Sequence, residues 1–278
     1  LRVVAMAAPT DDEIAPRLAF ARRIAAECGQ RLLHIRACGR WPEGPIVGDV
    51  GDQAADAYLQ GSLRARFPED GLLSEETQDG PERLDRRWAW IVDPLDGTKE
   101  YRQGRHDWAV HVGLAYDGAA VAGALAFPAI GRVAAGVCGF GARRVELTGS
   151  GGDWPTTLPA DPGPDAPRRL RMVCSRSHTP ALVQRIAGGL DAELVPCGSV
   201  GFKVAMLLFG AADLYVHKQG LREWDVCAPE AVARAAGFVV CRFDGAPHRY
   251  NRPDPRSDEI LVCRPWLRER ALALLASD

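Results

Sequence analysis

The stretch from residue 90 to residue 98 constrains this chain more than any other part of it, and it reads WIVDPLDGT. Its apolar start predicts a buried strand that delivers Asp93, and Pro94 and Gly97 predict a sharp turn after it. Asp93 and Asp96 would then lie close together at the end of the strand. Two such carboxylates repel each other unless a cation neutralises them, and their hard oxygen atoms suit Mg²⁺. The pattern therefore indicates a magnesium site, with a solvated, Asp-rich turn as the alternative.

Two further acidic motifs lie at the ends of predicted elements. Glu75 follows a strand-like run at 72–73, and Asp225 precedes a helix of small residues. For Asp225 the alternative is an ordinary residue of the first helical turn, which the helix dipole favours. The step from Gly97 to Thr98 offers backbone N–H groups that suit a phosphate if a helix begins there. Together these motifs favour the metal site over the solvated turn.

The overall charge and the cysteine pattern exclude several classes of function. The formal net charge is -2, so the chain has no broad basic face for nucleic acid. None of the 8 cysteines forms a C-x-x-C pair, which argues against a zinc site or a redox pair. No apolar run approaches the roughly 20 residues that a membrane span needs. We expect a cytoplasmic protein that binds neither nucleic acid nor membrane and takes a small anionic substrate.

The spacing of apolar residues predicts a series of helices and strands. Helices are expected over 11–37, from near Asp52 to Pro68, and over 180–188, 201–210, 224–236 and the C-terminal residues. Strands are expected at 72–73, 88–92, 108–115, 119–127, 170–174, 194–197, 213–217, 238–243 and 260–263.

This order of elements predicts two layered subdomains with a cleft between them. Residues 1–152 would form an N-terminal α+β subdomain that carries most of the metal ligands. Residues 153–168, rich in Pro and Gly, would be a linker. Residues 169–278 would form a C-terminal α/β subdomain that carries Asp225 and the substrate-binding residues.

In order and approximate spacing, three motifs resemble the signatures of the inositol monophosphatase superfamily: Glu75-Glu76, the stretch from Asp93 to Thr98, and Trp224-Asp225. The resemblance extends from about Asp52 to Ala236. It implies a layered α/β/α/β/α sandwich and a mechanism with two or three Mg²⁺ ions in each active site. It also implies a homodimer and inhibition by lithium.

The resemblance assigns roles to individual residues. Glu75, Asp93 and the carbonyl group of Leu95 would hold a first Mg²⁺, while Asp93, Asp96 and Asp225 would hold a second. The backbone N–H groups of Gly97 and Thr98 would bind the phosphate that is removed. A water molecule oriented by Glu75 and Thr98 would attack the phosphorus atom in line.

The segment around Asp52 departs from the pattern of the superfamily. Asp52 lies where the superfamily has an Asp that supports the threonine, but a Val-Thr-x-Ala segment normally precedes it. Here residues 48–51 read GDVG. Either Asp49 replaces that function or the local turn differs. The alternative for Asp52 is a helix N-cap.

A few residues bear on the choice of substrate. Glu100, in a D-G-T-K-E-Y motif, and Glu223 before Trp224 resemble the 3′(2′),5′-bisphosphate nucleotidase branch, which hydrolyses 3′-phosphoadenosine 5′-phosphate. Such a substrate needs a second anion site beyond the metals. The candidates for contact with substrate are Lys203, Lys218, Arg222 and Ser199, and for each cation the alternative is a side chain that faces solvent.

The favoured function is a phosphomonoesterase that releases the 3′-phosphate of this nucleotide in sulfur assimilation. One alternative is a broader phosphatase for inositol 1-phosphate or fructose 1,6-bisphosphate. A second is a non-catalytic sensor of metal or nucleotide. A haloacid-dehalogenase mechanism is excluded, because it needs a nucleophilic Asp where Pro94 stands.

Overall fold

The computed structural model describes residues 8–41, 44–77, 80–149 and 154–276. The first half of these residues begins with two long helices, α1 (Asp11–Ala37) and α2 (Pro45–Arg66). A six-stranded sheet follows in the order of the chain, and within it only β1 and β2 run parallel. Its strands are β1 (Gly71–Ser74), β2 (Trp88–Asp96), β3 (Ala109–Tyr116), β4 (Ala119–Phe127), β5 (Arg132–Gly139) and β6 (Ala142–Thr148). The short helix α3 (Thr98–Arg102) follows β2 directly.

The second half forms a five-stranded sheet in the order β10-β11-β9-β7-β8. Its strands are β7 (Leu170–Ser175), β8 (Ala192–Cys197), β9 (Leu214–Lys218), β10 (Val239–Cys241) and β11 (Glu259–Cys263). The helices of this half are α4 (Ala181–Leu190), α5 (Val200–Leu208), α6 (Glu223–Ala235) and α7 (Arg268–Leu275).

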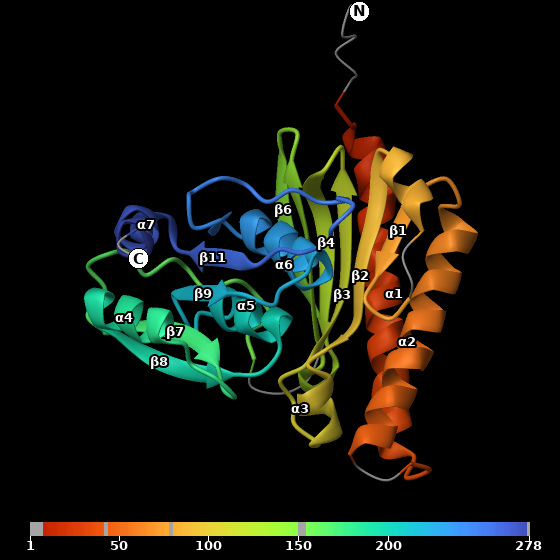
Figure 1. Ribbon diagram of the computed structural model, residues 1–278, viewed down its shortest axis with the longest axis horizontal. Helices are drawn as coiled ribbons and strands as arrows, with labels where there is room; N and C mark the ends of the chain where they lie inside the picture. The colour runs from red at the N-terminus through yellow and green to blue at the C-terminus, as the bar shows by residue number, and fades with distance from the viewer. Residues whose placement is uncertain (1–7, 42–43, 78–79, 150–153, 277–278) are drawn as a thin grey trace, which may run out of the picture.

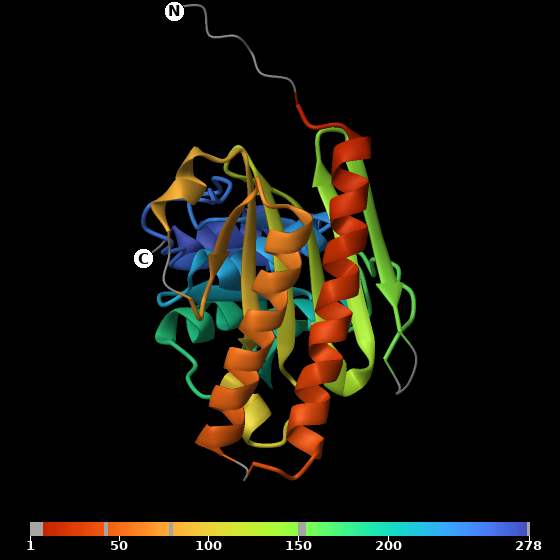
Figure 2. The same cartoon turned by 90° about the vertical axis from the view of Figure 1, so that its right-hand side faces the viewer.

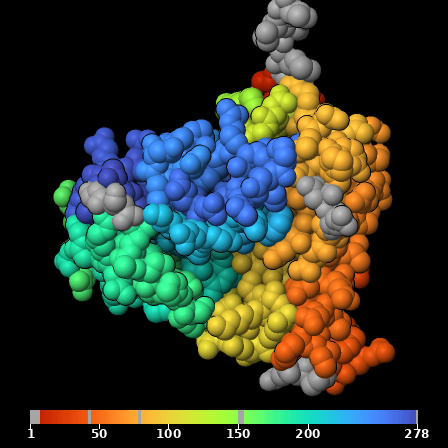
Figure 3. Space-filling view, in the orientation of Figure 1, coloured from red at the N-terminus to blue at the C-terminus, as the bar shows by residue number. Residues whose placement is uncertain are grey.

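The elements stack in five layers. Helices α1 and α2 cover one face of the six-stranded sheet, α5 and α6 lie between the two sheets, and α4 and α7 lie outside the second sheet (Figures 1 and 2). This arrangement confirms the predicted α/β/α/β/α sandwich. On the face shown in Figure 3, the second half of the chain, coloured green to blue, lies directly against the first half, coloured orange to yellow. Within the described residues, no helix is both long and apolar enough to span a membrane.

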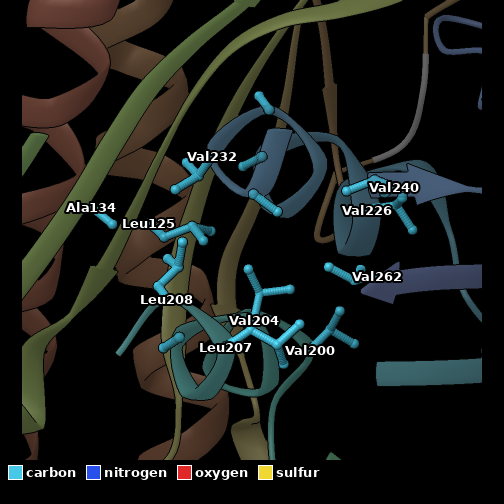
Figure 4. Close-up of a cluster of buried hydrophobic side chains, with 14 of the residues drawn as sticks. Leu125, Ala134, Val200, Val204, Leu207, Leu208, Val226, Val232, Val240 and Val262 are labelled. Atoms are coloured by element: carbon cyan, nitrogen blue, oxygen red, sulfur yellow. The ribbon is translucent and has the colours of Figure 1, made fainter. Parts of the chain in front are cut away.

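One apolar core joins the two halves of the chain. Figure 4 shows side chains from the first sheet, from α5 and α6, and from the second sheet that point toward one another: Leu125, Ala134, Val200, Val204, Leu207, Leu208, Val226, Val232, Val240 and Val262. Burial of this interface stabilises the positions of both sheets relative to α6. Because α6 carries Asp225, this core also fixes the distance of Asp225 from the first sheet.

A row of glycines allows α6 to lie close to the first sheet. Gly113, Gly123 and Gly136 are neighbours across β3, β4 and β5. A Cβ atom on Gly123 would lie 2.9 Å from the carbonyl oxygen of Ala228, and one on Gly136 would lie 2.6 Å from the Cβ of Ala235. Both distances are shorter than van der Waals contact. The absence of side chains at these positions therefore determines how close α6 lies to the first sheet.

The second helix begins earlier than predicted. It starts at Pro45 rather than near Asp52, since Pro is favoured at the first position of a helix. Gly51 lies inside it, where a Cβ atom would come within 3.1 to 3.3 Å of Tyr101, Leu32 and Leu95. Asp52 is therefore a residue of the helix interior, and its interpretation as a helix N-cap is wrong.

Two other differences concern the strands. No strand is predicted over 132–148, yet β5 and β6 pair there, and β6 forms the edge of the sheet. Alanine and glycine dominate β5, and β6 carries three charged residues, so neither shows the usual strand pattern. No helix or strand is described between β6 and β7, but the division into subdomains stays a prediction. Its boundary at residues 152 and 153 lies outside the described residues.

Candidate active site

The end of β2 places two carboxylates on the same side of the sheet. In a regular strand, residues three apart point to opposite faces. Here the pairing with β3 shifts between Asp93, opposite His111, and Asp96, opposite Ala109. The extra residue in β2 is a β-bulge, and Pro94 lies within it, where no ladder hydrogen bond needs its missing N–H. The bulge brings both side chains to one site, and both are buried.

Helix α6 adds the third carboxylate from the other half of the chain. Asp225 is the third residue of this helix, and one of its oxygens, Oδ2, accepts a hydrogen bond from the backbone N–H of Arg222 at 2.6 Å. One ligand atom from each of Asp93, Asp96 and Asp225 lies within 4.8 Å of the others. The structure thus brings together three of the residues that the sequence predicts as metal ligands.

Asp96 is the carboxylate that stays ionised. Its Oδ2 accepts hydrogen bonds from the hydroxyl of Ser199 and from the N–H of Gly201 at 2.7 Å, and it lies 3.0 Å from Nε2 of His111. Burial alone would raise the pKa of Asp96, but the charge of His111 and these donors hold it at about 2. Because all three groups reach Oδ2, its Oδ1 is the oxygen that they leave for a metal.

The other carboxylates of the site are poorly neutralised by the protein. Burial and the charges of Glu75, Asp96 and Asp225 raise the pKa of Asp93 well above its ordinary value. Burial and the charge of Asp96 raise the pKa of Asp225 to about 7. Glu75 is exposed, yet its carboxyl group contacts that of Asp93, and desolvation raises its pKa. A divalent cation would relieve this repulsion, and an all-oxygen donor set suits Mg²⁺, so these residues fit the metal.

Thr98 and Asp52 meet beside this cluster. Thr98 begins α3, and its hydroxyl lies 3.3 Å from Oδ1 of Asp52 and 3.1 Å from the carbonyl oxygen of Leu95. Burial and the charge of Glu76 raise the pKa of Asp52 to about 7. Gly97 precedes Thr98 with a φ of 92°, a left-handed conformation that favours glycine. The sequence prediction that Asp52 supports the threonine is consistent with this contact.

The departure of residues 48–51 has a local explanation. Asp49 lies on α2 one turn before Asp52, and its Oδ1 accepts a hydrogen bond from Arg102 at 2.6 Å. A Cβ atom on Gly48 would lie 2.0 Å from Nε of Arg102. The glycine therefore gives Arg102 the room to cross α2. Asp49 serves to tie α3 to α2 and does not lie in the carboxylate cluster.

The predicted substrate residues differ in their surroundings. Lys203 is buried, and its ammonium group donates hydrogen bonds to the carbonyl oxygens of Gly198 and Ser199, so its interpretation as a solvent-facing cation is wrong. The hydroxyl of Ser199 binds Asp96 and also accepts a hydrogen bond from the N–H of Phe202. Lys218 is exposed at the end of β9, while Arg222 is half-buried at the start of α6.

Comparison with known proteins identifies the family of this chain. The model of the inositol monophosphatase family matches residues 41–277. The chain belongs to the inositol monophosphatase family. The match covers all three of the motifs described above, so it confirms the resemblance predicted from the sequence.

Within the inositol monophosphatase family, mycobacterial relatives are similar over most of the chain. The 3′-phosphoadenosine 5′-phosphate phosphatase of Mycobacterium tuberculosis is 37% identical over 244 residues, which cover 86% of this chain and 85% of the relative. The protein of the same name from Mycobacterium leprae is 37% identical over 256 residues and 88% of each chain. The solved structure of CysQ from Bacteroides thetaiotaomicron has a TM-score of 0.73 at 24% identity, covering 90% of this chain and 97% of that one, and shows the same fold.

The sequence pattern does not identify His111 as part of this inositol monophosphatase site. His111 is fully buried, and its Nδ1 lies 3.2 Å from the carbonyl oxygen of Trp224. Burial alone would lower the pKa of His111, but the charge of Asp96 outweighs it and the pKa is raised. A histidine within the apolar run 109–115 was the available signal. Its contact with Asp96 depends on the bulge in β2, which the pattern does not reveal.

Proposed function

We propose that this protein is a magnesium-dependent phosphomonoesterase that hydrolyses 3′-phosphoadenosine 5′-phosphate to AMP and phosphate. The observation that carries the proposal is the set of three carboxylates within 4.8 Å, of which Asp93 and Asp96 are buried and Asp225 is half-buried. The pKa values of Asp93 and Asp225 are raised. The names of the mycobacterial relatives support the choice of substrate. The proposal thus has two parts: the reaction, which is hydrolysis of a phosphate ester, and the substrate, which is this nucleotide.

Asp93, Asp96 and Asp225, with Glu75 and the carbonyl group of Leu95, would hold two or three Mg²⁺ ions. Bound magnesium supplies neutralisation of the phosphate charge and activation of the attacking water. In this proposal Glu75 and Thr98 orient that water. The hydroxyl of Thr98 can donate to Asp52 or to the Leu95 carbonyl, which leaves its oxygen to accept a hydrogen bond from the water. The N–H groups of Gly97 and Thr98 would hold the phosphate.

The chemical step is a simple displacement. The water oxygen forms a bond to phosphorus and gives up a proton, the bond from phosphorus to the 3′-oxygen breaks, and the 3′-oxygen of AMP gains a proton in its place. Charge develops on the leaving oxygen, so groups already fixed around it lower the barrier. Two hydrogen-bond donors and the neighbouring His111 hold Asp96, and one donor holds Asp225, so these ligands need little rearrangement before reaction.

A second phosphate of the substrate needs cations outside the carboxylate cluster. We assign this role first to Arg222, whose backbone N–H already binds Asp225, and to Lys218 at the end of the neighbouring strand. Lys203 is committed to two carbonyl groups, so we assign it, with Ser199, to holding the loop beside Asp96. Direct contact of Lys203 or Ser199 with substrate stays a prediction.

The decisive experiment measures phosphate release with Mg²⁺ from 3′-phosphoadenosine 5′-phosphate, inositol 1-phosphate and fructose 1,6-bisphosphate. We expect kcat/KM for the nucleotide to be at least tenfold higher, which is about 1.4 kcal/mol of discrimination. Asp93→Asn should abolish release, whereas Asp165→Asn, on an exposed carboxylate, should not change it. Equal rates on the sugar phosphates would leave a broader phosphatase. No release from any ester would refute the enzyme and favour a sensor.

Three further parts of the proposal concern the setting of the enzyme. We place it in the cytoplasm, as a homodimer that lithium inhibits. All 8 cysteines are free, which is consistent with a reducing compartment. Light scattering of the purified protein and lithium titration of its activity would test the other two parts.

A further inference from the structure

Asp56 is a buried carboxylate that the proposed reaction does not use. It lies on α2 one turn after Asp52 and is 8% exposed. Its Oδ1 accepts a hydrogen bond from the hydroxyl of Ser74 at 2.6 Å. Its Oδ2 accepts one from the hydroxyl of Thr77 at 2.6 Å and one from the side-chain amide of Gln60 at 2.7 Å. All three partners are neutral.

The two hydroxyl partners stand on either side of Glu75 and Glu76. Ser74 is the last residue of β1, and Thr77 lies three residues later in the bend that leaves the sheet. Figure 1 shows β1 beside α2, which is the helix that carries Asp56. One carboxylate on a helix therefore holds both ends of the segment that presents Glu75. We call residues 74–77, held in this way, the glutamate turn.

The backbone alone holds the glutamate turn weakly. Beyond the last strand pair, the hydrogen bond from the N–H of Glu75 to the carbonyl oxygen of Val92 is 3.3 Å long. Glu75 itself is exposed, so packing does not fix its side chain. Two of the hydrogen bonds that Asp56 accepts come from the two ends of this turn, and this favours Asp56 as the group that fixes it.

We propose that Asp56 is a positioning residue for Glu75, and that it sets the affinity of the site for Mg²⁺ by fixing the glutamate turn against α2. Asp56 touches neither the metal ligands nor the substrate in this proposal. The inference rests on the proposed function for its kinetic readout, but metal binding can be measured without it. Removal of a group that hydrogen-bonds to a metal ligand typically changes metal affinity or activity by about 10- to 100-fold. Asp56 acts through the residues on either side of the ligand, so we expect an effect at the lower end of this range.

The test compares variants of the full chain by calorimetric titration with Mg²⁺ and by kinetics at varied Mg²⁺. We expect Asp56→Ala to weaken Mg²⁺ binding about tenfold or more and to lower kcat, with the KM for the nucleotide changed less than twofold. Ser74→Ala and Thr77→Val, which each remove one contact, should show smaller losses in the same direction. Asp56→Asn, which retains one acceptor, should restore part of the binding. Gln53→Ala, on the exposed face of the same helix, is the control and should match the wild type.

The outcomes separate the inference from the function. Asp56→Ala that binds Mg²⁺ as tightly as the wild type would overturn the positioning role. If Asp56→Ala does not fold, Ser74→Ala and Thr77→Val decide, and unchanged Mg²⁺ binding in both would overturn it as well. Wild-type protein that releases no phosphate would refute the proposed function, while the calorimetric comparison would still confirm or refute the role of Asp56.

Discussion

Ser199 links the helix α5 to the metal site through one hydroxyl group. It donates to Oδ2 of Asp96 and accepts from the N–H of Phe202, which caps the helix. Serine is one of the few residues that can do both, since its hydroxyl is a donor and an acceptor. The left-handed turn at Gly97 lies against it, with 3.0 Å between the Ser199 Cβ and the position of a Gly97 Cβ.

Ser199→Ala should therefore cost stability and metal affinity together. Loss of a helix cap and of a buried hydrogen bond costs about 1 to 2 kcal/mol. We expect the Tm to fall by several degrees with and without Mg²⁺, and the Mg²⁺ concentration for half-maximal activity to rise. Thermal denaturation and a magnesium titration measure the two effects. Ser177→Ala, on an exposed serine, should change neither, and an unaltered Tm for Ser199→Ala would contradict the capping role.

At the residue scale, the sequence predicts the ligands better than their supports. Asp93, Asp96 and Asp225 follow apolar runs or precede a helix, so their positions can be read from one stretch of chain each. His111 and Gly201 contact Asp96 from elsewhere in the sequence, and only folding brings them there. Lys203 shows the same limit, because its burial against two carbonyl groups depends on the α5 loop.

At the scale of elements, the position of α6 decides whether the site can form. The helix carries Asp225 at its first turn and lies on Gly113, Gly123 and Gly136. A Cβ atom at Gly113 would come within 2.9 Å of the backbone nitrogen of Ala228. Backbone atoms cannot move aside as a flexible side chain can. Any side chain in this row must therefore push the helix away from the sheet.

Gly123→Ala should displace α6 and weaken the site from a distance. Overpacking of this kind typically costs about 1 to 3 kcal/mol. We expect a lower Tm and a weaker response to Mg²⁺, although no ligand is changed. Gly61→Ala is the matched control, because nothing lies within 4 Å of its Cβ position in the exposed part of α2. That control should be neutral or slightly stabilising. If Gly123→Ala behaved like the control, the glycine row would not determine how close α6 lies to the first sheet, and the prediction would be wrong.

The elements themselves were predicted unevenly for physical reasons. Strands with long apolar runs, such as β3 and β4, and the periodic helix α1 are apparent from their sequences. The start of α2 is not apparent, because glycines in a helix interior are unfavourable unless close packing requires them, as Leu32 and Tyr101 do at Gly51. The bulge in β2 is not apparent either, since the pairing register depends on two strands.

At the scale of the whole molecule, magnesium and protons compete for the same carboxylates. Burial raises the pKa of Asp225 and of Asp52 to about 7, above the ordinary carboxylate value of about 4. At these two groups the metal-free folded state therefore binds more protons than the unfolded chain. Their contribution to stability is greatest below about pH 4 and falls as the pH rises toward and through 7. Mg²⁺ binds the ionised form and offsets this loss.

The increase in Tm caused by Mg²⁺ should consequently grow between pH 5 and pH 8. Thermal unfolding at Mg²⁺ concentrations raised in 10-fold steps would measure this increase, with protein treated with a chelator as the metal-free reference. Asp93→Asn removes one of the competing charges, so its metal-free form should lose less stability over the same pH range. An increase in Tm that is equal at pH 5 and pH 8 would show that the carboxylates are ionised in the metal-free protein throughout.

The three carboxylates come from both sides of the connection between β6 and β7: Asp93 and Asp96 precede it, and Asp225 follows it. A chain cut in that connection would yield two pieces, neither of which has all three groups. Each piece would keep one side of the apolar interface that joins the halves. Hydrolysis of the phosphate ester by a mixture of the two pieces would then show that they had reassociated. The arrangement that makes this protein a phosphatase also suits it to be a two-part sensor of molecular proximity.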